Sequence, residues 1–376
     1  MNTSLNRRTS LRALATLAAL SAVAAPSFAQ ADDETGSLRH GKLFISSNAP
    51  SGNQVLVYAR ATAGVPTLLG TFATGGNGTG AGLGSQGAVT LSRDGRYLFV
   101  VNAGSNTLST FSFGGGTMTL TSVVNTNGTT PTSVAEYSGL VYVMNAGGDG
   151  NVAGFRNTAG VLAPLADGVR GLSQAGGTAP GQVSINNYGD VLVVAERATQ
   201  RLTSYSIGAN GSLSRRAVTT TPGVTPFGHA YSNNDTLIVS EAATSSVSSY
   251  RFVDNSRFDA PRVVTSALGN GQGAACWIAT TPNGRFAFSA NAATSNVSAF
   301  GVARDGRLTL LSAIAGSTGP NAGAVDMAVS PDGQQLHVFA SRAPQIASFT
   351  ISASGSLSAL GTSTGMPLGS AGLAAN

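Results

Sequence analysis

The sequence predicts an all-β protein, a seven-bladed β-propeller of four-stranded antiparallel blades. Three observations predict this fold: a strand pattern that recurs seven times, hairpin turns at fixed places around each copy, and a composition suited to short strands. The chain has 376 residues, of which 49 are Gly and only 10% are charged. This length exceeds that of one ordinary domain, but a repeat fold can use all of it.

The recurring pattern consists of two polar or small residues, a β-branched residue or Leu, three mostly small residues and an aromatic residue. The fourth copy, for example, begins with Gln200-Arg201-Leu202 and ends at Tyr205. The seven aromatic positions, which lie 44 to 53 residues apart, are Tyr58, Phe111, Phe155, Tyr205, Tyr250, Phe300 and Phe349. Seven copies in one register predict seven copies of the same structural unit.

Hairpin turns flank the pattern on both sides. Upstream, Asp94-Gly95 and Asn283-Gly284 precede apolar runs, and downstream Asp305-Gly306 begins a second turn. Gly accepts the positive φ that such turns need. Each unit therefore reads as four short antiparallel strands, which is typical of a propeller blade.

The two ends of the chain predict how the ring closes. Before Tyr58 there is room for a strand at residues 42–46, but no clear innermost strand precedes it. After Phe349 the chain ends with residues 371–374, which resemble an innermost strand. We therefore expect the C-terminal strand to join the first blade, so that the propeller spans residues 37–376 and has no open edge.

Residues 1–29 read as a signal peptide. Arg7 and Arg8 precede an apolar stretch at 13–25, and small residues end the segment at Ala29. The apolar stretch is too short to span a bilayer. We expect a periplasmic or secreted protein, exported by either the Sec or the twin-arginine route. The single cysteine, Cys276, excludes an intramolecular disulfide.

The charge balance argues against nucleic acid as a partner. Three of the 21 basic residues lie within residues 1–29, which leaves 18 basic against 16 acidic residues, a net charge of +2. These charges form no basic cluster. We expect a small-molecule ligand, no stable membrane span and, for a closed ring, a monomer.

Blade geometry predicts a ligand site at one mouth of the central channel, where strand one of each blade begins and strand two ends. The strand-one column comprises Ala88, Ser133, Gln182, His229, Trp277 and Asp326. The strand-two column comprises Asn48, Asn102, Asn145, Glu196, Glu241, Asn291 and Ala340. The chemical diversity of the first column suggests a shaped pocket. The second column looks structural except at its two Glu residues.

His229 and Glu241 are the predicted catalytic pair, because imidazole and carboxylate are the usual proton-transfer groups. The structural alternative is that His229 caps a loop and Glu241 replaces a turn-forming Asn. The expected substrate-binding residues are Gln182, Glu196, Arg197, Trp277, Asp326 and Ser133. For Glu196 and Arg197 a surface ion pair is the alternative, and for Trp277 it is packing.

No cofactor is predicted. Three His and one Cys cannot supply a His/Cys metal cluster, although a calcium ion held in the channel by carbonyls and Asp326 or a Glu remains an alternative. The Gly-rich segment Gly75 to Gly87 is either an ordered lid or a mobile loop.

The turns and strands resemble those of the lactonase-type seven-bladed propeller family. The residues that carry the resemblance are Pro282-Asn283-Gly284-Arg285, Ser295-Asn296-Val297-Ser298 and Gly306-Arg307-Leu308. That family includes propeller-type 6-phosphogluconolactonases and carboxymuconate cycloisomerases, and the resemblance covers essentially all of the chain after the signal peptide.

Members with known chemistry carry Gly-Pro-Arg-His at the start of one blade and Asn-Glu at the end of its second strand. This chain has Phe227-Gly228-His229 and Ser240-Glu241, so the histidine and the glutamate match. Gly228 stands at the arginine position, and Gln182 stands where the preceding blade has a histidine.

The resemblance implies an exported lactonase-like hydrolase that acts on an uncharged or weakly charged cyclic ester at the channel mouth. Either His229 or Glu241 would activate water. The departures at Gly228 and Gln182 favour the alternative, a non-catalytic propeller of the cell envelope that binds a ligand or a protein.

Overall fold

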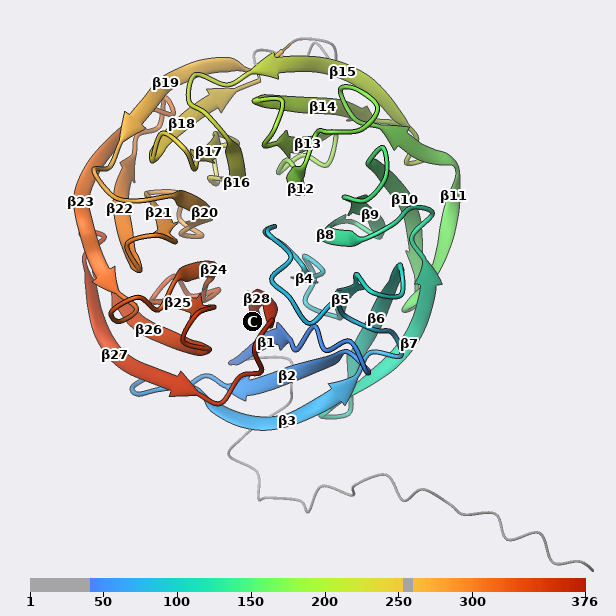
Figure 1. Ribbon diagram of the computed structural model, residues 1–376, viewed down its shortest axis with the longest axis horizontal. Helices are drawn as coiled ribbons and strands as arrows, with labels where there is room; N and C mark the ends of the chain where they lie inside the picture. Colours follow the sequence, from blue (N-terminus) through green and yellow to red (C-terminus); the bar gives the residue numbers. More distant parts are fainter. Residues whose placement is uncertain (1–40, 253–259) are drawn as a thin grey trace, which may run out of the picture. The chain divides into compact units, whose positions relative to one another are not determined.

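Seven four-stranded antiparallel sheets form a ring in the computed structural model, which describes residues 41–252 and 260–376. Figure 1 shows the seven blades around a central axis. The predicted all-β class and the seven-bladed architecture are therefore confirmed. Within these two described ranges, no helix is long and apolar enough to cross a membrane.

The strands are given from the axis outward. The first blade contains β28 (Ala371–Ala375), β1 (Lys42–Ser46), β2 (Gln54–Ala59) and β3 (Thr67–Ala73). The second contains β4 (Val89–Leu91), β5 (Tyr97–Asn102), β6 (Thr107–Gly114) and β7 (Thr117–Asn125). The third contains β8 (Pro131–Tyr137), β9 (Leu140–Asn145), β10 (Asn151–Thr158) and β11 (Val161–Gly171). The fourth contains β12 (Pro180–Ile185), β13 (Val191–Glu196), β14 (Arg201–Ile207) and β15 (Leu213–Thr220).

The remaining three blades follow the same order. The fifth contains β16 (Pro226–Tyr231), β17 (Leu237–Glu241), β18 (Ser246–Arg251) and β19 (Arg262–Gly269). The sixth contains β20 (Ala275–Thr280), β21 (Phe286–Asn291), β22 (Asn296–Val302) and β23 (Leu308–Ser317). The seventh contains β24 (Ala324–Val329), β25 (Gln335–Ala340), β26 (Gln345–Ile351) and β27 (Leu357–Thr364).

The C-terminal strand closes the ring, as the sequence predicts. β28 pairs antiparallel with β1, with Phe44 opposite Ala374. Next to this pairing, the backbone N–H of Gly41 donates to the carbonyl of Asn376 at 3.0 Å. Because these contacts join the two ends of the propeller, the first blade gains an inner strand and the ring has no break.

The seven aromatic residues of the repeat all lie on the third strand of a blade and are buried. In every blade the pairing of the third strand with the fourth shifts register just before this aromatic, for example between Thr110 and Phe111. Such a bulge bends and twists the outer strand. The repeat therefore marks the position where each blade twists around its core.

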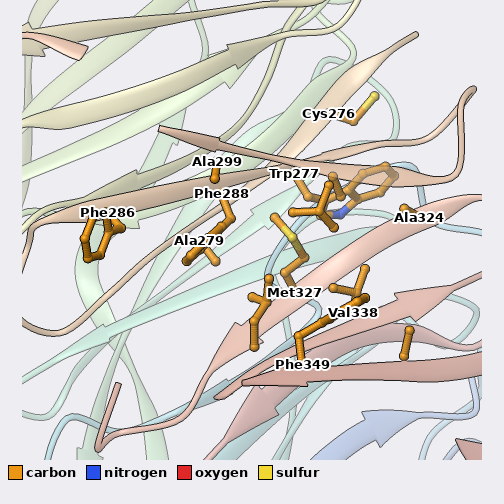
Figure 2. Packing of buried hydrophobic residues seen from close by; sticks show 14 of the residues in the cluster. Cys276, Trp277, Ala279, Phe286, Phe288, Ala299, Ala324, Met327, Val338 and Phe349 are labelled. Carbon is orange, nitrogen blue, oxygen red and sulfur yellow. The ribbon is translucent and has the colours of Figure 1, made fainter. Parts of the chain in front are cut away.

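Apolar side chains fill the spaces between neighbouring blades. One cluster joins the first and seventh blades through Leu43, Tyr58 and Phe339. Another lies between the sixth and seventh blades, where Figure 2 shows Phe288 and Met327 among its members. This packing holds the inner strands at fixed distances from the axis and so positions the residues at the channel mouth.

Candidate functional site

The beginning of strand one is irregular in the blades that carry the predicted site residues. The register between strands one and two shifts at the pairs Pro131/Ser133, Pro180/Gln182, Pro226/His229, Ala275/Trp277 and Ala324/Met327. A bulge changes the direction in which a strand presents its side chains. The strand-one column therefore sits on locally bent backbone at the edge of the channel.

Three members of this column, Ser133, Gln182 and Asp326, each accept a hydrogen bond from the backbone of the next blade. The backbone N–H of His229 donates to Gln182 Oε1 at 2.6 Å, and that of Gly372 donates to Asp326 Oδ2 at 2.9 Å. Ser133 Oγ accepts a backbone N–H of β12 in the same way. The chemical diversity of the column thus serves in part to join strand one of adjacent blades.

Glu241 is completely buried at the end of β17 and accepts three hydrogen bonds. The backbone N–H of Gly223 and the hydroxyl of Ser248 donate to Oε1 at 2.9 and 2.7 Å, and Ser246 Oγ donates to Oε2 at 2.7 Å. Gly223 precedes strand one, whereas the two serines belong to strand three. The carboxylate therefore ties the incoming loop to the blade.

Glu196 and Asn102, two other members of the strand-two column, also connect loops and strands through buried hydrogen bonds. Glu196 is fully buried and accepts from the hydroxyls of Ser173, Thr199 and Thr203. Asn102 accepts from Thr74 Oγ1 at 2.7 Å and donates to a serine hydroxyl on β6. The two glutamates thus occupy the same structural position as the asparagines.

The role of Glu241 predicts a difference between two substitutions. Glu241→Gln should lower the free energy of unfolding by less than about 1 kcal/mol, because an amide can accept from Gly223 while the serine hydroxyls rotate, as they do around Asn102. Glu241→Ala removes every acceptor and should cost about 2–4 kcal/mol. Urea unfolding of both variants measures this; equal losses would contradict the structural role.

His229 is buried on β16, and its imidazole forms no hydrogen bond with Glu241. Burial lowers the pKa of the imidazole to about 4, and the backbone groups of Phe227 and Val193 raise it only in part. The ring is therefore neutral at physiological pH. His229 and Glu241 are therefore not hydrogen-bonded to each other, and because both are buried a ligand cannot reach them as a proton-transfer pair.

The Gly-rich segment 75–87, left open between a lid and a mobile loop, is ordered and fills the channel mouth. Figure 1 shows the coil between β3 and β4 running into the middle of the ring. Ser85 Oγ donates to the carbonyl of Thr132 at 2.7 Å, and the N–H of Gln86 donates to Gly181 at 3.0 Å. We call residues 75–87 the plug.

Trp277 contacts the plug and an aromatic neighbour. Its indole N–H donates to the carbonyl of Ser85 at 3.0 Å, and its ring lies 4.7 Å from that of Phe227. The Arg197 guanidinium lies 5.3 Å from the centre of the Phe227 ring, and its Nε donates to the carbonyl of Ala179 at 2.9 Å. Trp277 and Arg197 thus both contact Phe227, next to the plug.

Arg197 carries a positive charge that no carboxylate balances in the described part of the chain, where the ion pairs are Arg60–Asp332, Arg96–Asp94 and Arg307–Asp305. Burial lowers the pKa of the guanidinium, which still stays protonated. The predicted surface ion pair with Glu196 is therefore not formed.

A cavity of about 350 Å³ lies in the channel beneath the plug. Its lining runs from Gln86 and Gly87 along the inner strands to Ile185 and Ala375 at their far ends. Gln182 and Asp326 line it near the plug. The volume falls within the range of small-molecule sites, about 300–1,000 Å³.

Asp326 and Glu136 are the two carboxyl groups that line this cavity, and burial raises the pKa of both. We consider Asp326 as the proton-transfer group because, like Gln182, it lies on an inner strand next to the plug. Burial raises its pKa to about 7, and hydrogen bonds from the backbone of Gly372 and Gly87 oppose this increase. Gln182 Oε1 accepts from the backbone N–H of His229, and no hydrogen bond of its Nε2 to another residue is found in the described part of the chain. The cavity thus combines a base with an amide donor.

Metal ligation has little support from the described side chains. No group of three or more His, Cys, Asp or Glu that could hold a metal ion occurs in residues 41–252 and 260–376. Asp326 already accepts from the backbone, so a calcium ion would have to rely mainly on carbonyl groups.

Gln86 is the residue of this region that sequence reasoning missed. Its side chain reaches β20, 192 positions further along the chain. The length and Gly content of the segment before it were a signal of something unusual, but no local pattern predicts which blade its side chain contacts.

The comparison with protein families concerns most of the propeller. The family model described as "Lactonase, 7-bladed beta-propeller" matches residues 51–169 and 228–370, well over half of the chain. The chain belongs to this family. Gln182, Glu196 and Arg197 lie in the fourth blade of this lactonase-family propeller, within the interval between the two matched ranges. No curated protein matches the chain.

Solved structures share the fold at low sequence identity. A protein from Lactobacillus plantarum has a TM-score of 0.71 at 19% identity, with 88% of this chain and 98% of that chain covered. The periplasmic gluconolactonase of Pseudomonas aeruginosa has a TM-score of 0.68 at 19% identity, with the same coverage of 88% and 98%. At these identities the likeness establishes the fold.

Proposed function

We propose that this lactonase-family propeller is a hydrolase that opens a cyclic ester in the cavity beneath the plug. The observation that carries the proposal is the placement of the Asp326 carboxyl and the Gln182 amide on the wall of one cavity of about 350 Å³. Family membership and the gluconolactonase among its structural neighbours support lactone chemistry. The substrate is a small lactone.

Asp326 would act as the general base. In its ionised form it takes a proton from water as the water oxygen attacks the lactone carbonyl carbon. Gln182 Nε2 donates a hydrogen bond to the carbonyl oxygen as that oxygen gains negative charge. The ring C–O bond then breaks, the proton passes from Asp326 to the leaving oxygen, and the product is a hydroxy acid.

His229 would be a positioning residue in this reaction. Its backbone N–H donates to Gln182 Oε1 at 2.6 Å and so fixes the orientation of the Gln182 amide, a residue of the cavity wall. Glu241, Glu196 and Ser133 would support the inner strands through the hydrogen bonds described above. Arg197 and Trp277 lie at the plug rather than at the proposed reacting atoms.

A panel of lactones tests this function. The purified protein, mixed with D-glucono-1,5-lactone, δ-valerolactone or dihydrocoumarin, should release acid faster than the spontaneous reaction. Gln182→Leu removes the amide donor and should lower kcat by about 100-fold, as loss of one oxyanion donor does. Gln174→Leu, in an exposed loop of the same blade, is the control and should leave kcat unchanged.

A second candidate is a non-catalytic binding propeller of the envelope. It is favoured by the burial of His229 and Glu241 and by the plug that closes the channel mouth. Absence of turnover across the panel would favour this reading, and a thermal-shift screen with small polar ligands would then identify what binds.

We also propose that the protein is exported. The support is the arginine pair, apolar stretch and small residues of segment 1–29, which lies outside the described residues. N-terminal sequencing of the protein recovered from the periplasm or medium should begin at Gln30. An intact Met1 in that fraction would count against cleavage by a signal peptidase.

A further inference from the structure

The plug is held in the channel through the side chain of Gln86. Gln86 Nε2 donates to the carbonyl of Ile278 at 2.7 Å, and Gln86 Oε1 accepts from the N–H of Ile278 at 3.0 Å. Ile278 belongs to β20, the innermost strand of the sixth blade, whose other edge pairs with β21. The amide therefore pairs with a free strand edge as a peptide group would.

The space that Gln86 occupies depends on a missing side chain. A Cβ at Gly228 would lie 2.2 Å from Gln86 Oε1 and 2.6 Å from the carbonyl oxygen of Cys276. Any larger residue at 228 would thus collide with the plug. Glycine at position 228 therefore leaves room both for the Gln86 amide and for the backbone of β20.

The plug is attached by polar contacts rather than by apolar burial. Gly78 and Ser85 are its buried residues, and Leu83 is partly buried. Gly80, Gly84 and Gly87 have φ of +75°, +59° and +85°, a backbone region that favours glycine. Hydrogen bonds to Asn48 hold the first half of the plug. The half that contains Gln86 has few apolar contacts and is the part that opens at the lower free-energy cost.

We propose that the inner edge of β20 at Ile278 is a ligand-binding site, which Gln86 fills as an internal ligand. The site takes a small molecule that presents a hydrogen-bond donor beside an acceptor in one plane, as a carboxamide or a lactam does. Such a ligand reproduces both hydrogen bonds to Ile278 and displaces the plug. This inference does not rest on the proposed hydrolase activity.

Two intrinsic probes lie next to this site. Trp277, the only tryptophan of the chain, donates its indole N–H to Ser85 of the plug. Cys276, the only cysteine, is buried, and burial raises the pKa of its thiol to about 12. Figure 2 shows the sulfur of Cys276 pointing away from Met327 and Phe349. Displacement of the plug removes the acceptor of the Trp277 indole and should alter its fluorescence. It should also loosen the cluster in which Trp277 packs with Cys276, and so make the thiol more accessible.

The test compares the wild-type protein with Gln86→Ala and Gln86→Glu. Glu keeps the size of Gln but cannot donate to the carbonyl of Ile278, so both variants weaken the plug. We expect Cys276 to react with a maleimide at least about 10-fold faster in both variants than in the wild type. We also expect 2-piperidone, titrated by Trp277 fluorescence, to bind at least about 10-fold more tightly to Gln86→Ala than to the wild type, because the ligand no longer competes with the two hydrogen bonds of Gln86.

Gln174→Ala serves as the matched control, because the hydrogen bond of the Gln174 amide within the described residues is to the carbonyl of Gly176 in its own exposed loop. It should behave as wild type in both measurements. Circular dichroism and cooperative unfolding establish that the variants are folded. An unchanged rate of Cys276 labelling in both Gln86 variants, or no fluorescence response of folded Gln86→Ala to 2-piperidone, would overturn the proposal.

Discussion

Replacement of Asp326 by Asn should lower kcat for lactone hydrolysis by at least about 100-fold, the range expected when a general base is removed. The variant keeps nearly the same shape, and its side-chain oxygen can still accept from the backbone N–H of Gly372. An amide cannot take the proton of the attacking water. The measurement is kcat for the panel member that the wild-type protein hydrolyses fastest.

The same residue predicts the pH dependence of the wild-type enzyme. The pKa of Asp326 is about 7 because of burial, and the ionised carboxylate is the active base. The rate should therefore rise with pH between about 5.5 and 8.5, with its midpoint near neutrality, after correction for spontaneous hydrolysis. A flat profile, or full activity of Asp326→Asn, would refute the assignment of Asp326 as base.

Asp326 should also make the stability of the protein depend on pH. An aspartate in the unfolded chain has a pKa near 4, whereas the buried group has a pKa of about 7. Between these values the folded state holds a proton that the unfolded state has lost, so stability falls as pH rises through this window. The full difference corresponds to about 4 kcal/mol, reached above about pH 7.

Asp326→Asn removes this penalty. The variant and the wild type should have similar free energies of unfolding near pH 4, and the variant should be several kcal/mol more stable near pH 8. Urea titrations at the two pH values measure the difference. Asp94→Asn, which changes an exposed carboxylate paired with Arg96, is the control. An equal difference between Asp326→Asn and wild type at both pH values would show that Asp326 does not titrate as described.

The fold could be predicted from the sequence because its determinants are local. Each aromatic residue marks the third strand of a blade, and each Asp-Gly or Asn-Gly turn follows from the φ that Gly permits. Strand β1 begins and ends at the predicted residues 42 and 46. Ring closure could be predicted because the first blade lacked an inner strand and the C-terminus supplied one.

The candidate site was harder to predict, because the decisive contacts join distant parts of the chain. A column position shows which residues face the channel mouth, but not that Gly223 and two serines saturate Glu241. The plug depends on Gln86 meeting Ile278, which no repeat or turn pattern encodes. Asp326 was identified as a candidate, yet its suitability as a base follows from burial that only the folded ring creates.

The most direct test of the account compares Asp326→Asn with Glu241→Gln on the same lactone near pH 8. Asp326 faces the cavity, whereas Glu241 is enclosed by its three donors. We predict that Glu241→Gln keeps kcat within about threefold of wild type while Asp326→Asn loses at least about 100-fold. The reverse result, with activity lost in Glu241→Gln and kept in Asp326→Asn, would place the reaction at the channel mouth and contradict the account.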